Sequence, residues 1–186
     1  TDYLDTILLH NPPFELLNGG SPIYEVFEEL KKEGKIRAYG ASVDSSREML
    51  EIVQSTNSQV IEILFNIFHQ SPAEVFPLAK EKGVGIITKV PLDSGWLSGK
   101  YDAKSQFADI RKRWSPEVIE RRFELLKQME FLTADGSTMV QAALRFILAY
   151  PEVSTVIPGV KDTKQLKENL SASDKTLSAE MVQRLR

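Results

Sequence analysis

The chain has 186 residues, 42% of them hydrophobic, and a formal net charge of −3 from 23 basic and 26 acidic side chains. This length can bury one sizeable core, and the interspersed charges argue against nucleic-acid binding as the main role. The sequence contains no cysteine, which excludes disulfides and thiol chemistry. Residues 1–5 lack the basic start of a signal peptide and no apolar run is long enough to span a membrane, so we expect a cytoplasmic protein with no membrane contact.

Strand-like and helix-like segments alternate along the chain. In chain order we predict strand 4–10, helix 22–32, strand 36–42, helix 47–54, strand 60–65, helix 73–82, strand 86–90, helices 115–129 and 138–150, strand 153–157, and helices 163–170 and 178–185. Repeated β-α units predict a parallel sheet, because each parallel connection needs a crossover helix. Barrels and doubly wound sheets both bind ligands at the carboxyl ends of such strands, and periodicity alone does not choose between them.

The last predicted strand leads through a tight turn into a capped helix. The apolar run 153–157 stops at Pro158-Gly159, as expected of a buried strand. Asp162 or the next residue then offers a side-chain oxygen that can cap the helix 163–170.

Polar side chains on this helix indicate a site for a phosphorylated, purine-like ligand, close to Lys161. Those that share one face are Gln165, Glu168 and Asn169. We expect a second face, with Leu166 and Leu170, to point to the core. An ordinary amphipathic helix with a solvated face explains the same pattern about equally well.

Four blocks of this sequence resemble the aldo-keto reductase family in their order and spacing, and together they cover nearly the whole chain. The blocks are Asp2–His10, Gly34–Ser42, Pro91–Tyr101 and the stretch from Ile157 to Asn169. The resemblance implies an α/β fold of the (β/α)8 TIM-barrel type. It also implies an NADPH- or NADP+-dependent oxidoreductase that interconverts small carbonyl compounds and alcohols.

The resemblance equates strand 4–10 with the fourth barrel strand and strand 153–157 with the eighth. We therefore expect residues 1–186 to form a single, incomplete barrel domain that holds strands 4–8 only. Residues 92–136 would be its covering loop and inserted helix. Because five strands of eight leave two unpaired edges, we expect an N-terminal barrel half or an oligomer partner to supply the rest.

His10 is the one catalytic residue that the resemblance assigns to this chain, where a ring nitrogen would orient or polarise a carbonyl. Taken alone, a histidine after an apolar run is more often a hydrogen-bonded core residue. The family's catalytic tyrosine, lysine and aspartate belong to strands before Leu4, so we predict that this chain alone is inactive. Two distant histidines and no cysteine predict no metal site.

The resemblance implies that Ser42 forms a hydrogen bond with the carboxamide of the nicotinamide. Glu62 stands where many relatives have glutamine, and Lys89 stands where many stack an aromatic ring. A carboxylate can accept a hydrogen bond from the carboxamide but cannot donate one. Our hypothesis is that Glu62 and Lys89 form an ion pair beneath the ring. The alternative is that they lie at different heights and pair elsewhere.

The resemblance implies that the glycine-containing loop lies over the pyrophosphate of the cofactor. Arg111 resembles a basic residue of the loop that covers the cofactor. The expected loop contacts are Val90, Leu92, Ser94, Gly95, Leu97 and Lys100. The alternative for Arg111 to Arg113 is a solvated basic turn. The loop lacks the spacing of a P-loop, which excludes a nucleoside triphosphatase.

At the adenosine end, the resemblance assigns Gly159, Lys161, Gln165, Glu168 and Asn169. A cation beside the 2′-phosphate favours NADPH over NADH, and Lys161 matches that position. The alternative function is a non-catalytic NADPH-binding regulatory or interaction protein of the same fold.

Overall fold

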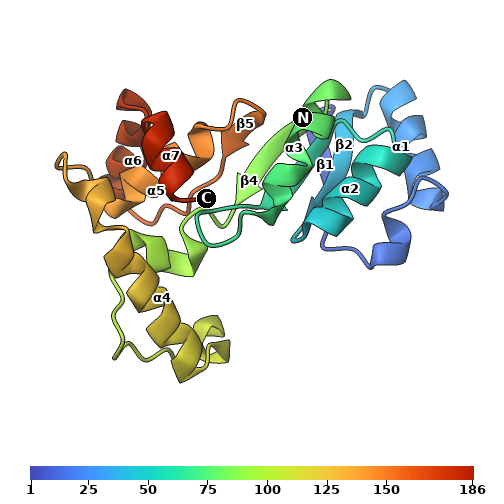
Figure 1. Ribbon diagram of the computed structural model, residues 1–186. Helices are drawn as coiled ribbons and strands as arrows, with labels where there is room; N and C mark the ends of the chain where they lie inside the picture. Colours follow the sequence, from blue (N-terminus) through green and yellow to red (C-terminus); the bar gives the residue numbers. More distant parts are fainter. The chain divides into compact units, whose positions relative to one another are not determined.

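The computed structural model describes residues 1–186, and for Ile110 it describes the backbone alone. The chain divides into two compact units, which are described separately (Figure 1). The first comprises Thr1–Phe65, His69–Lys89 and Tyr150–Ile157, and the second comprises Asn66–Phe68, Val90–Ala149 and Pro158–Arg186.

The first unit is built on a parallel sheet of five strands, which lie in the order of the sequence. The strands are β1 (Leu4–His10), β2 (Ile36–Val43), β3 (Val60–Leu64), β4 (Gly85–Lys89) and β5 (Val153–Val156). All neighbouring pairs are parallel, so the carboxyl ends of the strands lie along one edge. The predicted β-α alternation is confirmed, and each strand end lies within one residue of its predicted position.

Three α-helices pack against this sheet in the blue-to-green part of Figure 1. They are α1 (Pro22–Lys32), α2 (Ser46–Ser55) and α3 (Phe76–Glu81). The short 3-10 helix η1 (Phe14–Leu16) precedes α1, and η2 (Ser71–Glu74) precedes α3. A buried aromatic cluster fixes α1, because Phe27 stacks on Tyr39 of β2 with 5.1 Å between ring centroids. Burial of such rings contributes much of the hydrophobic stabilisation of a small core.

The predicted helix 73–82 is wrong as a single element. The chain instead forms η2 and then α3, with a break at Val75. Pro77 explains the break, because it has no backbone N–H to donate to the carbonyl of the preceding turn.

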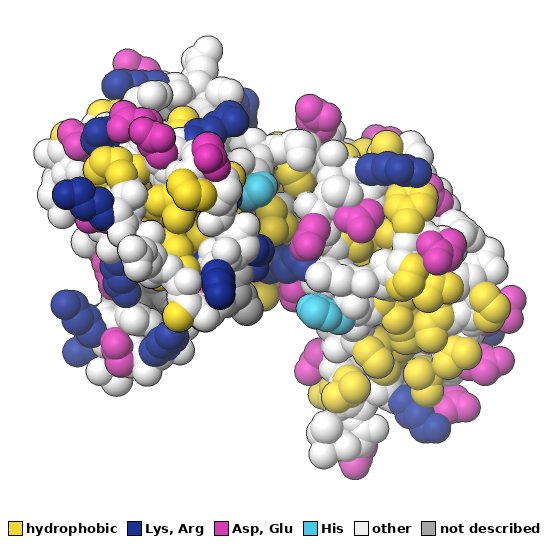
Figure 2. Space-filling view, turned by 90° about the horizontal axis from the view of Figure 1, so that it is seen from below, with side chains coloured by type: hydrophobic (Ala, Val, Ile, Leu, Met, Phe, Trp, Pro, Cys, Tyr) yellow, Lys and Arg dark blue, Asp and Glu magenta, His cyan; other side chains and the backbone are white. Residues whose placement is uncertain are grey.

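The strands at the two edges of the sheet, β1 and β5, are more exposed than the three strands between them. Tyr3 and Leu4, at the start of β1, are 39% and 49% exposed. Figure 2 shows that apolar side chains gather in patches on the surface it presents. The described sheet is therefore open, and its equivalence to strands 4–8 of an eight-stranded barrel stays a prediction.

The second unit is helical. Its α-helices are α4 (Pro116–Gln128), α5 (Met139–Leu148), α6 (Thr163–Leu170) and α7 (Ala179–Arg184), and its 3-10 helices are η3 (Asp93–Ser98), η4 (Ile110–Arg113), η5 (Glu130–Thr133) and η6 (Ser171–Asp174). Each α-helix begins at a side-chain cap, and α6 has the predicted bounds. Among the described residues, no helix is both long enough and apolar enough to cross a membrane.

Candidate functional site

A polar network joins the carboxyl ends of the strands of the first unit. The register of the sheet sets His10 opposite Ser42, and Ser42 opposite Glu62. The Ser42 hydroxyl donates a hydrogen bond to Glu62 Oε1 over 2.7 Å and accepts one from Lys89 Nζ over 2.9 Å. The structure thus brings together three predicted site residues from three strands, because the ends of parallel strands share one edge.

Lys89 is 9% exposed, and its ammonium group has a partner for each of its three N–H bonds. Besides the bond to Ser42, it donates to Asn11 Oδ1 over 3.0 Å and lies 2.9 Å from Asp44 Oδ1. The burial of this cation is therefore compensated by an ion pair and by hydrogen bonds.

The predicted ion pair between Glu62 and Lys89 is wrong. Among the described residues, Lys89 forms its ion pair with Asp44, and it reaches Glu62 only through the hydroxyl of Ser42. The register explains the difference, because Glu62 lies opposite Ile87 and Lys89 is two residues further along β4. Two residues of a strand correspond to about 6.6 Å, which separates the heights of the two side chains.

Asn11 and Asp44 were not among the predicted site residues. Each is the first residue after a strand, Asn11 after β1 and Asp44 after β2. Asn11 also has a φ of 44°, a left-handed conformation that asparagine tolerates better than most residues. A polar residue within two positions of the end of a predicted parallel strand was the signal in the sequence that could have found both.

His10 ends β1 and its side chain is exposed. Among the described residues, no group forms a hydrogen bond with its ring. Within the described residues it lacks the partner that a hydrogen-bonded core histidine requires, and its catalytic role stays a prediction. An exposed imidazole at this edge is available to a ligand as a hydrogen-bond donor or acceptor.

The loop of the second unit that follows β4 is strained. Val90, Asp93 and Ser94 have φ values of 53°, 44° and 55°, and a β-branched residue such as valine rarely adopts this conformation. Hydrogen bonds hold the loop, since Asn66 Nδ2 donates to the Val90 carbonyl over 2.9 Å and Arg122 Nε donates to Asp93 Oδ2 over 2.6 Å. Such strain costs about 1–3 kcal/mol per residue and clusters at functional sites.

Arg111 connects the covering segment to the strained part of this loop. Its Nε donates to the Ser94 carbonyl over 2.8 Å, and its guanidinium pairs with Asp109 and lies over the Tyr101 ring. The alternative of a solvated basic turn is therefore wrong for Arg111. Gly95 has a φ of 105°, and a Cβ there would lie 3.0 Å from Tyr101, so the loop requires glycine at this position.

The remaining predicted loop residues differ in what they can offer to a ligand. Leu97 is fully buried, so its side chain belongs to the core of the unit and only its backbone is available. Leu92 and Val90 are half-buried. Lys100 is exposed and can meet an anion.

The turn before α6 and the first turns of the helix form a compact group. Gln165 Oε1 accepts a hydrogen bond from the backbone N–H of Lys161 over 2.9 Å, and Asn169 Nδ2 donates to the Gly159 carbonyl over 3.4 Å. The ammonium group of Lys161 is exposed, with no hydrogen-bond or ion-pair partner among the described residues. Glu168 is half-buried on the same face, so four of the predicted residues and Gly159 lie together.

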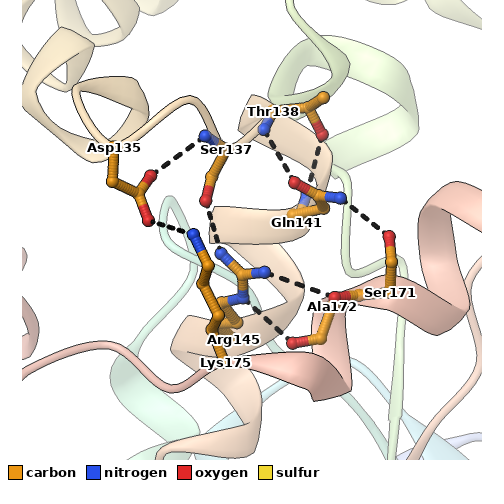
Figure 3. A network of polar contacts seen from close by, with 8 residues as sticks. All are labelled: Asp135, Ser137, Thr138, Gln141, Arg145, Ser171, Ala172 and Lys175. Atoms are coloured by element: carbon orange, nitrogen blue, oxygen red, sulfur yellow. Dashed lines mark hydrogen bonds and ion pairs between the residues drawn. The ribbon is translucent and has the colours of Figure 1, made fainter.

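The prediction that Leu166 and Leu170 face the core is wrong. They are 44% and 62% exposed, and α6 buries no residue fully. Polar contacts hold this part of the chain instead, as Figure 3 shows. The amide of Gln141 on α5 donates to the hydroxyl of Ser171, the residue directly after α6, over 2.7 Å.

Arg145 is the centre of the contacts in Figure 3 and is only 5% exposed. It donates to the Ala172 carbonyl over 2.9 Å, to the Ser171 carbonyl over 3.3 Å and to the Ser137 hydroxyl over 2.6 Å. The guanidinium thus meets carbonyls that follow the carboxyl end of α6, where a positive charge is favourable. These bonds position the helix that carries Gln165, Glu168 and Asn169.

No cluster of three or more His, Cys, Asp or Glu suited to a metal ion occurs among the described residues. In each unit separately, the predicted site residues offer hydrogen-bonding groups and ammonium groups. In the first unit these are neutral and acidic oxygens around one buried lysine, and in the second they are backbone groups with two exposed lysines, Lys100 and Lys161.

The fold and the site define an α/β protein that gathers its polar groups at the carboxyl edge of a parallel sheet, as β/α-barrel proteins do. Residues 1–186 match the model of the aldo/keto reductase family. The chain therefore belongs to this family, and the predicted family is confirmed.

Two relatives and one solved structure illustrate the similarity. The uncharacterized oxidoreductase YqkF of Bacillus subtilis is 32% identical over 174 residues, which are 94% of this chain and 56% of that protein. The NADH-specific methylglyoxal reductase of Escherichia coli is 30% identical over 202 residues, with coverages of 99% and 60%. The holo form of an aldo-keto reductase from Bacillus halodurans superposes with a TM-score of 0.77 at 29% identity, with coverages of 100% and 60%. The chain thus spans about three fifths of the length of these relatives.

Proposed function

We propose that the full-length protein is an NADPH-dependent oxidoreductase that interconverts small carbonyl compounds and alcohols by hydride transfer. The observation that carries the proposal is the hydrogen-bonded pair of Ser42 and Glu62 beside His10, within a chain that matches the aldo/keto reductase family over all its residues. A bound nicotinamide dinucleotide would supply or take up the hydride.

The residues of the first unit fit a nicotinamide carboxamide. Glu62 uses one carboxylate oxygen for Ser42, so the other can accept a hydrogen bond from the carboxamide NH2. Asn11 uses its oxygen for Lys89, so its NH2 group can donate to a carbonyl oxygen. His10 would orient or polarise the substrate carbonyl from the same edge.

The proposal concerns the full-length protein. By the family resemblance, the catalytic tyrosine, lysine and aspartate belong to strands that precede β1. We therefore expect residues 1–186 alone to be inactive, and we expect His10 to act together with those groups.

The choice of NADPH rests on Lys161. Its ammonium group is exposed and has no partner among the described residues, next to the amino-terminal turn of α6. An unpaired cation in this setting suits a phosphate group, and the 2′-phosphate distinguishes NADPH from NADH. The name of the Escherichia coli relative specifies NADH, so the preference of this protein needs its own measurement.

Titration of the full-length protein with NADPH and NADH tests the cofactor. We expect Lys161→Met to weaken NADPH binding about tenfold, because it removes a charge-assisted hydrogen bond, and to change NADH binding less than twofold. Lys167→Met removes an exposed lysine from the other end of α6 and serves as the control. Equal weakening of both cofactors by Lys161→Met would contradict the assignment of Lys161 to the 2′-phosphate.

Consumption of NADPH with a panel of small aldehydes and ketones tests turnover. We expect His10→Ala to lower kcat about 100-fold, the usual contribution of a residue that assists proton transfer or polarisation, while NADPH affinity stays unchanged. Tight NADPH binding without turnover of any carbonyl would instead identify the non-catalytic binding protein.

A further inference from the structure

The network at the carboxyl edge of the first unit contains two carboxylates and one ammonium group. The charges of Lys89 and Asp44 neutralise each other across 2.9 Å. Glu62 has a single hydrogen-bond partner among the described residues, the neutral hydroxyl of Ser42. Within the described residues, the network therefore keeps one negative charge without an ion-pair partner, and this charge resides on Glu62.

Lys89 fixes the direction of the Ser42 hydroxyl. The oxygen of Ser42 accepts from Lys89, so its single proton is given to Glu62 and cannot be donated to a ligand. Lys89 itself has no further N–H to offer, because Asn11, Ser42 and Asp44 take all three. A ligand would therefore contact the second carboxylate oxygen of Glu62. No cation is bound directly to this carboxylate among the described residues.

Among the described residues, no cation forms an ion pair with Glu62. Asp44 is followed at the start of α2 by Glu48, whose carboxylate accepts from the Asp44 backbone N–H over 3.2 Å. Arg37 lies near the amino end of β2 and pairs there with Asp5. Glu62 itself is half-buried, which reduces the screening of its charge by water.

We propose that Glu62 makes this site selective for the redox state of the dinucleotide. The oxidised nicotinamide ring carries a positive charge, and the reduced ring is neutral. The carboxamide group, from which Glu62 would accept a hydrogen bond, is bonded directly to that ring. The carboxylate therefore strengthens the binding of the oxidised form by electrostatic attraction. The reduced form binds without this attraction. The inference rests on the proposed function, which places the nicotinamide carboxamide at Ser42 and Glu62.

The test is the ratio of the dissociation constants of the reduced and oxidised forms, measured by calorimetry on the full-length protein at about pH 8. In Glu62→Gln we expect the ratio Kd(reduced)/Kd(oxidised) to fall by at least about fivefold, because two unit charges about 4 Å apart give this factor in bulk water and the half-burial of Glu62 reduces the screening. Glu81→Gln removes an exposed carboxylate from the end of α3 and should leave the ratio unchanged. The ring charge is the same in both cofactor pairs, so NADP+/NADPH and NAD+/NADH should respond alike.

A second variant keeps the test decisive if Glu62→Gln does not fold. Asp44→Asn leaves Lys89 without its counter-ion, so the ratio should fall in the same direction. An unchanged ratio in both variants, with both forms still bound, would overturn the inference while the proposed function stands. Failure of the unmodified protein to bind either form would refute the proposed function, and this inference with it.

Discussion

Lys89 donates a hydrogen bond to the hydroxyl of Ser42 over 2.9 Å, although 47 residues separate them in the sequence. Ser42 in turn donates to Glu62 over 2.7 Å. The serine hydroxyl therefore couples a lysine and a glutamate that have no direct ion pair. This coupling can be measured without a cofactor, through the free energy of unfolding.

We expect Lys89→Met and Glu62→Gln to be non-additive in that free energy, with a coupling of about 1 kcal/mol. The reason is that each substitution removes one of the two groups that orient the same hydroxyl. In the Ser42→Ala background the coupling should drop to nearly zero, as measured by urea denaturation of the unmodified protein and the seven single, double and triple variants. A coupling that persists without the hydroxyl would show that Lys89 and Glu62 interact directly.

Arg145 should be among the most important polar side chains for the stability of the second unit. Arg145→Met leaves two backbone carbonyls and the Ser137 hydroxyl without their donor, so we expect a loss of about 3 kcal/mol in the free energy of unfolding. Arg145→Lys should recover less than half, because an ammonium group lacks the planar fork that reaches three acceptors. Arg121→Met, at an exposed position of α4, is the control and should change stability by less than about 0.5 kcal/mol.

The strained loop after β4 offers a stabilising substitution. Ser94 has a φ of 55°, which glycine adopts without a steric penalty, and the loop bond to Arg111 uses only the Ser94 carbonyl. We expect Ser94→Gly to raise the melting temperature, with a gain of about 0.5–1 kcal/mol. Ser94→Ala keeps the strain and is the matched control. A gain in Ser94→Ala equal to that in Ser94→Gly would mean that relief of strain is not the cause.

Asp135 should make stability depend on pH in the acid range. Its hydrogen bonds with Ser137, and then the contact with Lys175, hold the pKa of the Asp135 carboxyl well below its usual range. Because the folded state lowers this pKa, the contribution is fully present above the carboxyl's ordinary pKa of about 3.9 and is lost as the pH falls through the lower folded value.

We therefore expect Asp135→Asn to be less stable than the unmodified protein at neutral pH, and the difference to shrink below about pH 4. Urea denaturation between about pH 7 and pH 2 measures this. Lys175→Met should retain part of the pH dependence, because the bonds to Ser137 remain. A difference that is constant across this range would contradict the assignment to Asp135.

Local sequence patterns were sufficient to predict the bounds of elements that depend on residues close to each other in the sequence. The bounds of α6 follow from the cap at Asp162, and β1 follows from the apolar run up to His10. The prediction failed at α3, where Pro77 interrupts the helical hydrogen bonds, although proline was visible in the sequence. It failed for Leu166 and Leu170, which are 44% and 62% exposed on a helix that buries no residue fully.

The sequence by itself determined the five strands, most of the helices, the aldo/keto reductase family and the residue types at the ends of the strands. Only the tertiary structure decided which of those residues are partners. Lys89 meets Asp44 and Ser42 rather than Glu62, because the register between separate strands sets the height of each side chain. Register arises from the packing of whole strands and helices, and periodicity within one segment carries no information about it.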